Sequence, residues 1–99
     1  MRHIRVLTAG AALLASAGAA SAVDIPPPGA AGCSGCHPVS RWTGSPVTRL
    51  NARNAADIVT AMQEFRAGKR PGTIMDRIAK GFANDEIKAI AAWYAAQKD

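Results

Sequence analysis

Cys33-Ser34-Gly35-Cys36-His37 is the stretch from which the fold can be worked out, because it holds both cysteines of the 99 residues. Two cysteines separated by two residues and followed at once by histidine form the attachment signature of c-type haem. Thiols three residues apart lie about one helical turn from each other, so each can add to one vinyl group of a single haem. His37 is then placed to bind the iron from one face, and small Ser34 and Gly35 let the porphyrin edge approach the backbone.

Three other chemistries use similar cysteine pairs, and each fits this chain less well. A thioredoxin-like redox pair needs a βαβ context, which the sequence lacks. A zinc site needs further Cys or His ligands, and none follows His37. A structural disulfide between residues three apart closes almost no loop and stabilises little. The motif therefore predicts covalent haem attachment through Cys33, Cys36 and His37.

The first 22 residues have the pattern of a secretory signal peptide. Residues 1–5 carry two arginines and no acid, residues 6–20 are apolar and rich in small side chains, and Ala20-Ser21-Ala22 fits the cleavage site. The apolar run is shorter than the roughly 20 residues that span a bilayer. We predict cleavage after Ala22, export to the periplasm and no membrane span in the mature chain.

The predicted mature chain, residues 23–99, is one small domain of 77 residues. Loss of Arg2 and Arg5 lowers the formal charge from +5 to +3, and two haem propionates bring it close to neutral. The chain has no basic run, which argues against a nucleic-acid partner. A domain this short is near the lower limit for an adequate apolar core. A buried haem would supply the missing interior.

Helical periodicity dominates the rest of the chain, and no strand pattern occurs. A helix is predicted over residues 54–67, with Asn54 as its N-cap and Gly68 at its end. A short helical turn is expected over residues 75–80, and the last helix is expected to begin with Asn84 as its cap. The two longer helices each carry one apolar stripe: Ile58, Ala61, Met62 and Phe65 in the first, and Ile87, Ile90, Ala91 and Tyr94 in the second.

The haem motif and the segment after it complete the predicted fold. A short helix should begin at residue 29 or 30 and stop at His37, because Pro38 follows. Residues 38–53 form a loop around the proximal face of the haem, in which Trp42 either covers the haem edge or fills core space. The carbonyl of Pro46 is a candidate acceptor for the far ring nitrogen of His37, unless Pro46 is only a turn residue. The fold class is thus all-α, with three to four helices wrapped around one haem.

The sixth position of the iron has few possible ligands. The only other histidine, His3, lies in the predicted signal peptide. Met62 falls within an apolar stripe, where methionine commonly fills core space. Met75 follows a loop rich in glycine and proline and lies 38 residues past His37, enough chain to reach the opposite haem face. We predict ligation by His37 and Met75, with an open or water-bound iron as the alternative.

Ligation by histidine and methionine has a functional meaning. A neutral, soft thioether favours ferrous iron and raises its reduction potential. With both axial positions filled, the iron cannot readily bind a substrate, so the site passes single electrons. The prediction is an electron-transfer protein that is not itself an enzyme.

The chain resembles the class I cytochromes c, through the haem motif, the Gly44-x-Pro46-x-x-x-Leu50 turn, the methionine loop and the last helix. Its second half is most similar to the cytochrome subunit of flavocytochrome c sulfide dehydrogenase. The segments that carry this likeness are IVTAMQEF at 58–65, GKRPGTIMDRIAKGF at 68–82 and DEIKAIA at 85–91. Some members have two haems, and this chain would match a single-haem form. Pro38, Arg41 and Trp42 replace the small residues common in that loop.

The resemblance implies a partner as well as a cofactor. In that family the cytochrome docks on an FAD-containing flavoprotein that oxidises sulfide, and passes the electrons to a soluble acceptor. The family's haem-linking and iron-binding residues carry over to Cys33, Cys36, His37 and Met75. Two alternatives stay open: a free-standing electron carrier with several partners, and an enzyme or gas sensor with an open haem.

Overall fold

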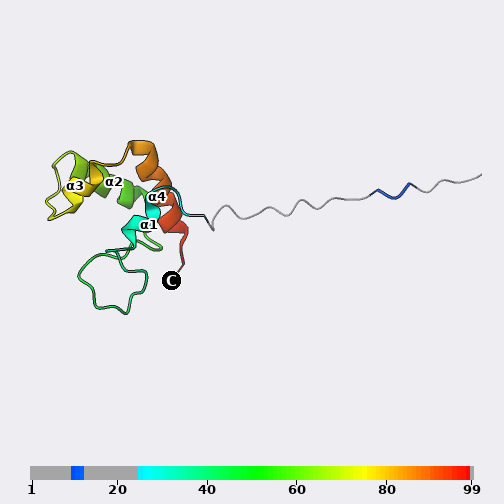
Figure 1. Cartoon of the computed structure of the whole chain (residues 1–99), viewed down its shortest axis with the longest axis horizontal. Helices are drawn as coiled ribbons and strands as arrows, with labels where there is room; N and C mark the ends of the chain where they lie inside the picture. Colours follow the sequence, from blue (N-terminus) through cyan, green and yellow to red (C-terminus); the bar gives the residue numbers. More distant parts are fainter. Residues whose placement is uncertain (1–9, 13–24, 99) are drawn as a thin grey trace, which may run out of the picture.

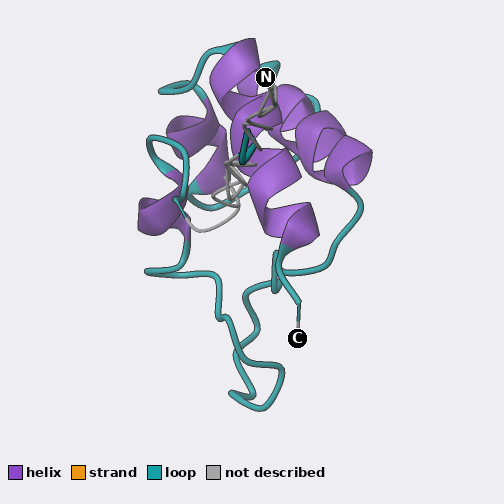
Figure 2. Cartoon of the chain, turned by 90° about the vertical axis from the view of Figure 1, so that its right-hand side faces the viewer, coloured by secondary structure: helices purple, strands orange, loops and turns teal. Residues whose placement is uncertain are grey.

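The computed structural model describes residues 10–12 and 25–98, and within them the regular structure is entirely helical (Figures 1 and 2). Four helices follow one another: α1 (Ala30–Cys33), α2 (Ala55–Arg66), α3 (Met75–Ala79) and α4 (Asn84–Ala96). Helix α2 contacts both α3 and α4. The all-α prediction is confirmed. The predicted signal peptide falls almost wholly outside the described residues.

Helix α2 begins and ends where the sequence indicates. The Asn54 side chain accepts a hydrogen bond from the backbone N–H of Asp57 at 3.2 Å, which satisfies one of the exposed donors of the first turn. Gly68, just beyond the C-cap, has a φ of 71°, a left-handed conformation that glycine adopts without strain. The chain then turns back through residues 69–74 to reach α3.

Helix α4 starts one residue earlier than the sequence suggests. Its N-cap is Ala83, and Asn84 is the first helical residue. Glu86 accepts a hydrogen bond from the Ala83 N–H at 2.9 Å and so caps the helix from inside. The Asn84 side chain instead accepts from Arg66 at 2.7 Å, which ties the start of α4 to the end of α2.

Helix α1 is shorter than predicted and ends at Cys33 rather than His37. The hydroxyl of Ser34 donates to the carbonyl of Ala31 at 2.9 Å, a local bond that competes with helix continuation. Residues 33–37 nevertheless form one more turn with helix-like spacing, because the His37 N–H donates to the Cys33 carbonyl at 2.9 Å. The two cysteines therefore still bracket a single turn.

The core joins the two ends of the domain. Ala30 of α1 belongs to one buried cluster with Ile58 of α2 and with three residues of α4: Ile90, Ala91 and Tyr94. Ile87 of α4 is buried as well, so the apolar stripe predicted for this helix is confirmed. Tyr94, only 2% exposed, donates its hydroxyl to the Ala30 carbonyl at 2.5 Å. Trp93 packs against this core with its ring at 87° to that of Tyr94. The haem motif is thus held on α4.

Replacing Tyr94 with phenylalanine tests this attachment. Loss of the hydroxyl leaves a buried carbonyl without this partner, so the free energy of unfolding should fall by about 1–3 kcal/mol in denaturant titration. Replacing Trp42, which is 87% exposed, with phenylalanine should change it by less than about 0.5 kcal/mol. Equal stability of the Tyr94 variant and the parent protein would contradict the proposed anchor.

The same tyrosine gives a pH dependence. Burial raises the pKa of Tyr94 above its ordinary value of 10.0, so folding favours the neutral phenol. Its contribution to stability should be complete below about pH 10 and decline as the pH rises further, because only the unfolded chain then ionises readily. The phenylalanine variant should lack this part of the alkaline decline.

The loop of residues 38–49 extends away from the helices (Figures 1 and 2). Trp42 is 87% exposed and neither covers the pocket nor fills the core, so both expectations for it were wrong. Within the loop, serine and threonine hydroxyl oxygens accept hydrogen bonds from nearby backbone N–H groups, as Ser45 does from the Val47 N–H. Its far end is fastened where the Ala52 N–H bonds to the Tyr94 carbonyl at 3.0 Å.

Candidate functional site

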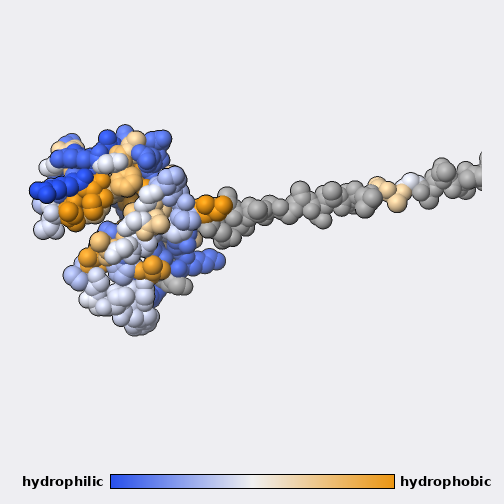
Figure 3. Space-filling view, in the orientation of Figure 1, coloured by the Kyte–Doolittle hydropathy of each residue, from blue (hydrophilic) through white to orange (hydrophobic). Residues whose placement is uncertain are grey.

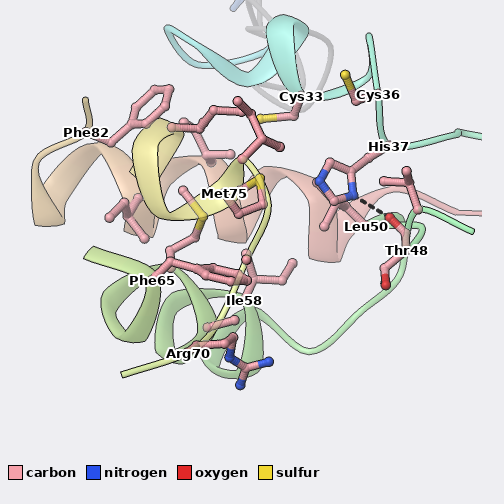
Figure 4. Close-up of a pocket in the computed structure, with 18 of the residues that line it drawn as sticks. Cys33, Cys36, His37, Thr48, Leu50, Ile58, Phe65, Arg70, Met75 and Phe82 are labelled. Atoms are coloured by element: carbon pink, nitrogen blue, oxygen red, sulfur yellow. Dashed lines mark hydrogen bonds between the residues drawn. The ribbon is translucent and has the colours of Figure 1, made fainter. Parts of the chain in front are cut away.

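A pocket of about 440 Å³ is lined by residues of all four helices and of the loops between them. Cys33, Cys36, His37 and Met75, the four predicted haem residues, all line it (Figure 4). The volume falls within the roughly 300–1,000 Å³ of ordinary cofactor and ligand sites. The fold thus brings together residues that lie up to 42 positions apart in the sequence.

Most of the pocket wall is apolar. Its larger side chains come from every helix except α1 and from the loops: Leu50, Ile58, Phe65, Ile78, Phe82 and Ile90. Gly29 at the start of α1 has a φ of 87°, and an added Cβ would meet the Phe82 ring at 2.6 Å. This close approach lets α1 sit directly over the wall. A flat apolar group bound here would remove these side chains from water, which is favourable. A polar ligand would make few apolar contacts with them.

The two thiols lie at one end of the pocket, and neither forms a disulfide. Cys33 is half-buried and its Sγ contacts the Gly29 carbonyl at 3.6 Å, while Cys36 is exposed. Burial raises the pKa of the Cys33 thiol, so Cys33 is protonated at neutral pH. Both cysteines line the pocket, Cys33 from the end of α1 and Cys36 from the turn that follows.

The imidazole of His37 is oriented by the loop that follows it. Its Nδ1 donates to the backbone carbonyl of Thr48. Because a carbonyl can only accept, the proton must be on Nδ1, which leaves the lone pair of Nε2 free to bind a metal. The prediction that the Pro46 carbonyl fills this role was wrong: Pro46 lines the pocket, but the acceptor lies two residues further along.

Met75, the first residue of α3, lies on the side of the pocket that faces His37 (Figure 4). The glycine-containing loop before it makes this position possible, because a Cβ at Gly72 would meet the Phe65 ring at 2.9 Å. Met62 also lines the pocket, while packing against the hydrophobic core. The structure therefore presents two thioethers to the pocket, of which Met75 is the one opposite the imidazole.

This donor set suits a haem better than a free metal ion. Within residues 10–12 and 25–98, no three His, Cys, Asp or Glu side chains lie together as ligands for a metal ion. A haem iron needs only two axial ligands from the protein. An apolar slot, two thiols at one end and an imidazole facing a thioether match that requirement.

Sequence similarity to known proteins agrees with the type of site described above. The chain resembles a cytochrome subunit. It is 34% identical over 62 residues to the cytochrome subunit of sulfide dehydrogenase from Chlorobaculum tepidum. This confirms the resemblance inferred from the motifs. No protein-family model matches the chain.

The match covers 63% of this chain and 56% of that relative, so it spans little more than half the relative's length. No helix within residues 10–12 and 25–98 is long and apolar enough to cross a membrane.

Thr48 is the site residue that sequence reasoning missed. Its contribution comes from the backbone carbonyl, so the identity of the side chain gives no signal. Only the path of the 38–49 loop decides which carbonyl meets the imidazole, and that loop has no periodicity from which its path could be predicted.

Proposed function

We propose that this protein is a periplasmic single-haem cytochrome c that carries single electrons as the haem subunit of a sulfide dehydrogenase. The observation that carries the proposal is an apolar pocket that Cys33, Cys36, His37 and Met75 all line. The likeness to a sulfide dehydrogenase cytochrome subunit supports the choice of system. The chain itself would catalyse no substrate turnover.

Each of the four residues has a defined task. Cys33 and Cys36 would hold the haem covalently, each thiol adding across one vinyl double bond. His37, oriented by the Thr48 carbonyl, and Met75 would supply the nitrogen and sulfur ligands of its iron. When bound, haem supplies an iron that gains and loses one electron. The apolar wall would surround the bound group with side chains that do not hydrogen-bond, in place of water.

Export places the protein where such attachment is completed. Residues 1–22 would direct the chain out of the cytoplasm and be removed after Ala22. The mature domain would then be residues 23–99. In the periplasm it would accept electrons from an FAD-containing flavoprotein and deliver them to a soluble acceptor.

An exposed apolar strip beside the pocket suits a stable partner. Ile74 and Ile78 flank Met75 and are 53% and 40% exposed. Figure 3 shows apolar atoms gathered over the region of α3, next to strongly hydrophilic ones. A dedicated subunit would bury such a strip against its partner.

The alternative function is a free-standing electron carrier. The observation that favours it is the set of exposed cations around the same strip: Lys69, Arg70, Arg77 and Lys80. Such a ring speeds encounters with acidic partners in a salt-dependent way. The apolar strip and the cations lie next to each other on the surface. The two functions therefore use the same face and differ in how long the complex with the redox partner lasts.

Purification from the native periplasm at low salt distinguishes them. A haem c spectrum together with bound flavin and a second, larger polypeptide is expected, and sulfide should reduce the haem through that flavin. A lone haem protein that sulfide does not reduce would contradict the subunit assignment. It would leave the free carrier, whose reduction by candidate donors should slow steeply as salt is added.

A further inference from the structure

The end of the pocket farthest from the cysteines carries a clamped arginine. The Nε of Arg70 donates to the Glu64 carboxylate at 2.9 Å, and its guanidinium carbon lies 5.6 Å from the centre of the Phe65 ring. The backbone N–H of Arg70 also bonds to the Glu64 carbonyl, at 3.3 Å. Arg70 lines the pocket even though its side chain is 45% exposed. Two contacts thus hold the otherwise flexible side chain, and the third holds the backbone beneath it.

Arg70 and the two thiols lie at opposite ends of the pocket. Figure 4 shows Cys33 and Cys36 at one end of the pocket and Arg70 at the other, with His37 and Met75 between them. In haem the vinyl groups and the two propionates lie toward opposite edges of the porphyrin. A haem joined through both cysteines must therefore direct its carboxylates toward the end where Arg70 lies.

The other charged groups around that end are few. Among the pocket-lining Asp, Glu, Lys and Arg side chains, the only others are Arg53, which precedes α2, and Asp57, in the first turn of that helix. Their charges offset each other. Glu64 offsets the charge of Arg70, but the hydrogen bond between them involves only the Nε of the Arg70 guanidinium. A guanidinium has five N–H donors in a planar fork, which suits a second carboxylate.

We propose that Arg70, held in place by Glu64 and Phe65, binds a propionate of the haem and sets the charge balance at that edge. This inference rests on the proposed function, because it requires a haem in the pocket. It assigns Glu64 a positioning role, since the carboxylate contacts Arg70 and not the pocket.

The test is the midpoint potential of the purified holoprotein, measured by spectroelectrochemistry as a function of pH, in the parent protein and in R70Q. Without the guanidinium the propionate should hold its proton more tightly, by about tenfold or more. The pH at which the potential begins to change should therefore move upward by about one unit or more. R70Q should also have the lower potential, because an uncompensated carboxylate favours ferric iron.

R77Q is the matched control. It removes the same charge from an exposed position on α3 that also flanks Met75 but does not line the pocket. Its pH profile should match that of the parent protein. R70K keeps the charge without the fork, so its shift should lie between those of R70Q and the parent.

The failures are distinguishable. Identical pH profiles for R70Q and R77Q, in proteins that carry covalent haem, would overturn the role of Arg70 and leave the cytochrome function intact. An R70K profile identical to that of the parent would contradict the forked contact. A parent protein without covalent haem would overturn the cytochrome function itself.

Discussion

Replacing Met75 with alanine should open the iron on one face and lower its reduction potential by the order of 0.1 V or more, within the about 0.8 V that axial ligands span. The reason is that the lost thioether stabilises ferrous iron relative to ferric iron. Alanine cannot replace it, and water or an added small ligand would take its position. The measurement is a redox titration of the holoprotein, together with the methionine–iron band of the ferric form and binding of added imidazole.

The outcome also decides between electron transfer and the open-haem function. The parent protein should bind added imidazole weakly and the Met75 variant strongly. A parent protein that binds small ligands as readily as the variant would contradict ligation by Met75. It would favour an enzyme or gas sensor with a vacant iron site.

Replacing Met62 with alanine should have the complementary effect, which is loss of stability without change of ligation. Met62 packs against the hydrophobic core and is partly buried, so the free energy of unfolding should fall by about 2 kcal/mol, at the lower end of the roughly 2–5 kcal/mol for such truncations. The ferric spectrum and the potential should stay close to those of the parent protein. Thermal or denaturant unfolding, followed at the haem absorption band, measures the stability. The ferric spectrum shows whether the iron ligands have changed.

The pair of methionine variants forms its own control, because both thioethers line the pocket. Met75 faces the imidazole (Figure 4). Met62 belongs to α2 and packs against the hydrophobic core. Loss of the methionine–iron band in the Met62 variant and its retention in the Met75 variant would reverse the assignment.

The helices were predictable because their signals are local. Asn54 caps α2 and Gly68 ends the segment as expected, and the stripe from Ile87 to Tyr94 is buried as its spacing indicates. Periodicity and capping act within a few residues, so the sequence displays them directly. The four predicted haem residues came from a motif and from elimination among possible ligands, and all four line one pocket.

The features that were missed depend on competition or on loop path. Asn84 could cap α4, but Glu86 reaches back to the Ala83 N–H and moves the start by one residue. The helix of the haem motif was expected to reach His37, but the Ser34 hydroxyl bonds to the chain behind it and α1 ends at Cys33. The alternative local hydrogen bonds differ in free energy by about 1 kcal/mol. Patterns of residue types do not resolve differences that small.

The loop of residues 38–49 shows the clearest limit. An exposed Trp42 and a Thr48 carbonyl on the imidazole were both unforeseen, because the segment has neither periodicity nor a long run of turn residues. Its ends are fixed by the haem motif and by the bond from Ala52 to Tyr94, and its middle follows its own short-range hydrogen bonds.

The most direct test is the intact mass of the exported protein under denaturing conditions. The account predicts residues 23–99 plus the mass of one haem, which stays attached after extraction with acidified acetone because thioether bonds hold it to Cys33 and Cys36. A chain of that length without haem, or one from which the haem is extracted, would contradict covalent attachment and with it the proposed cytochrome c.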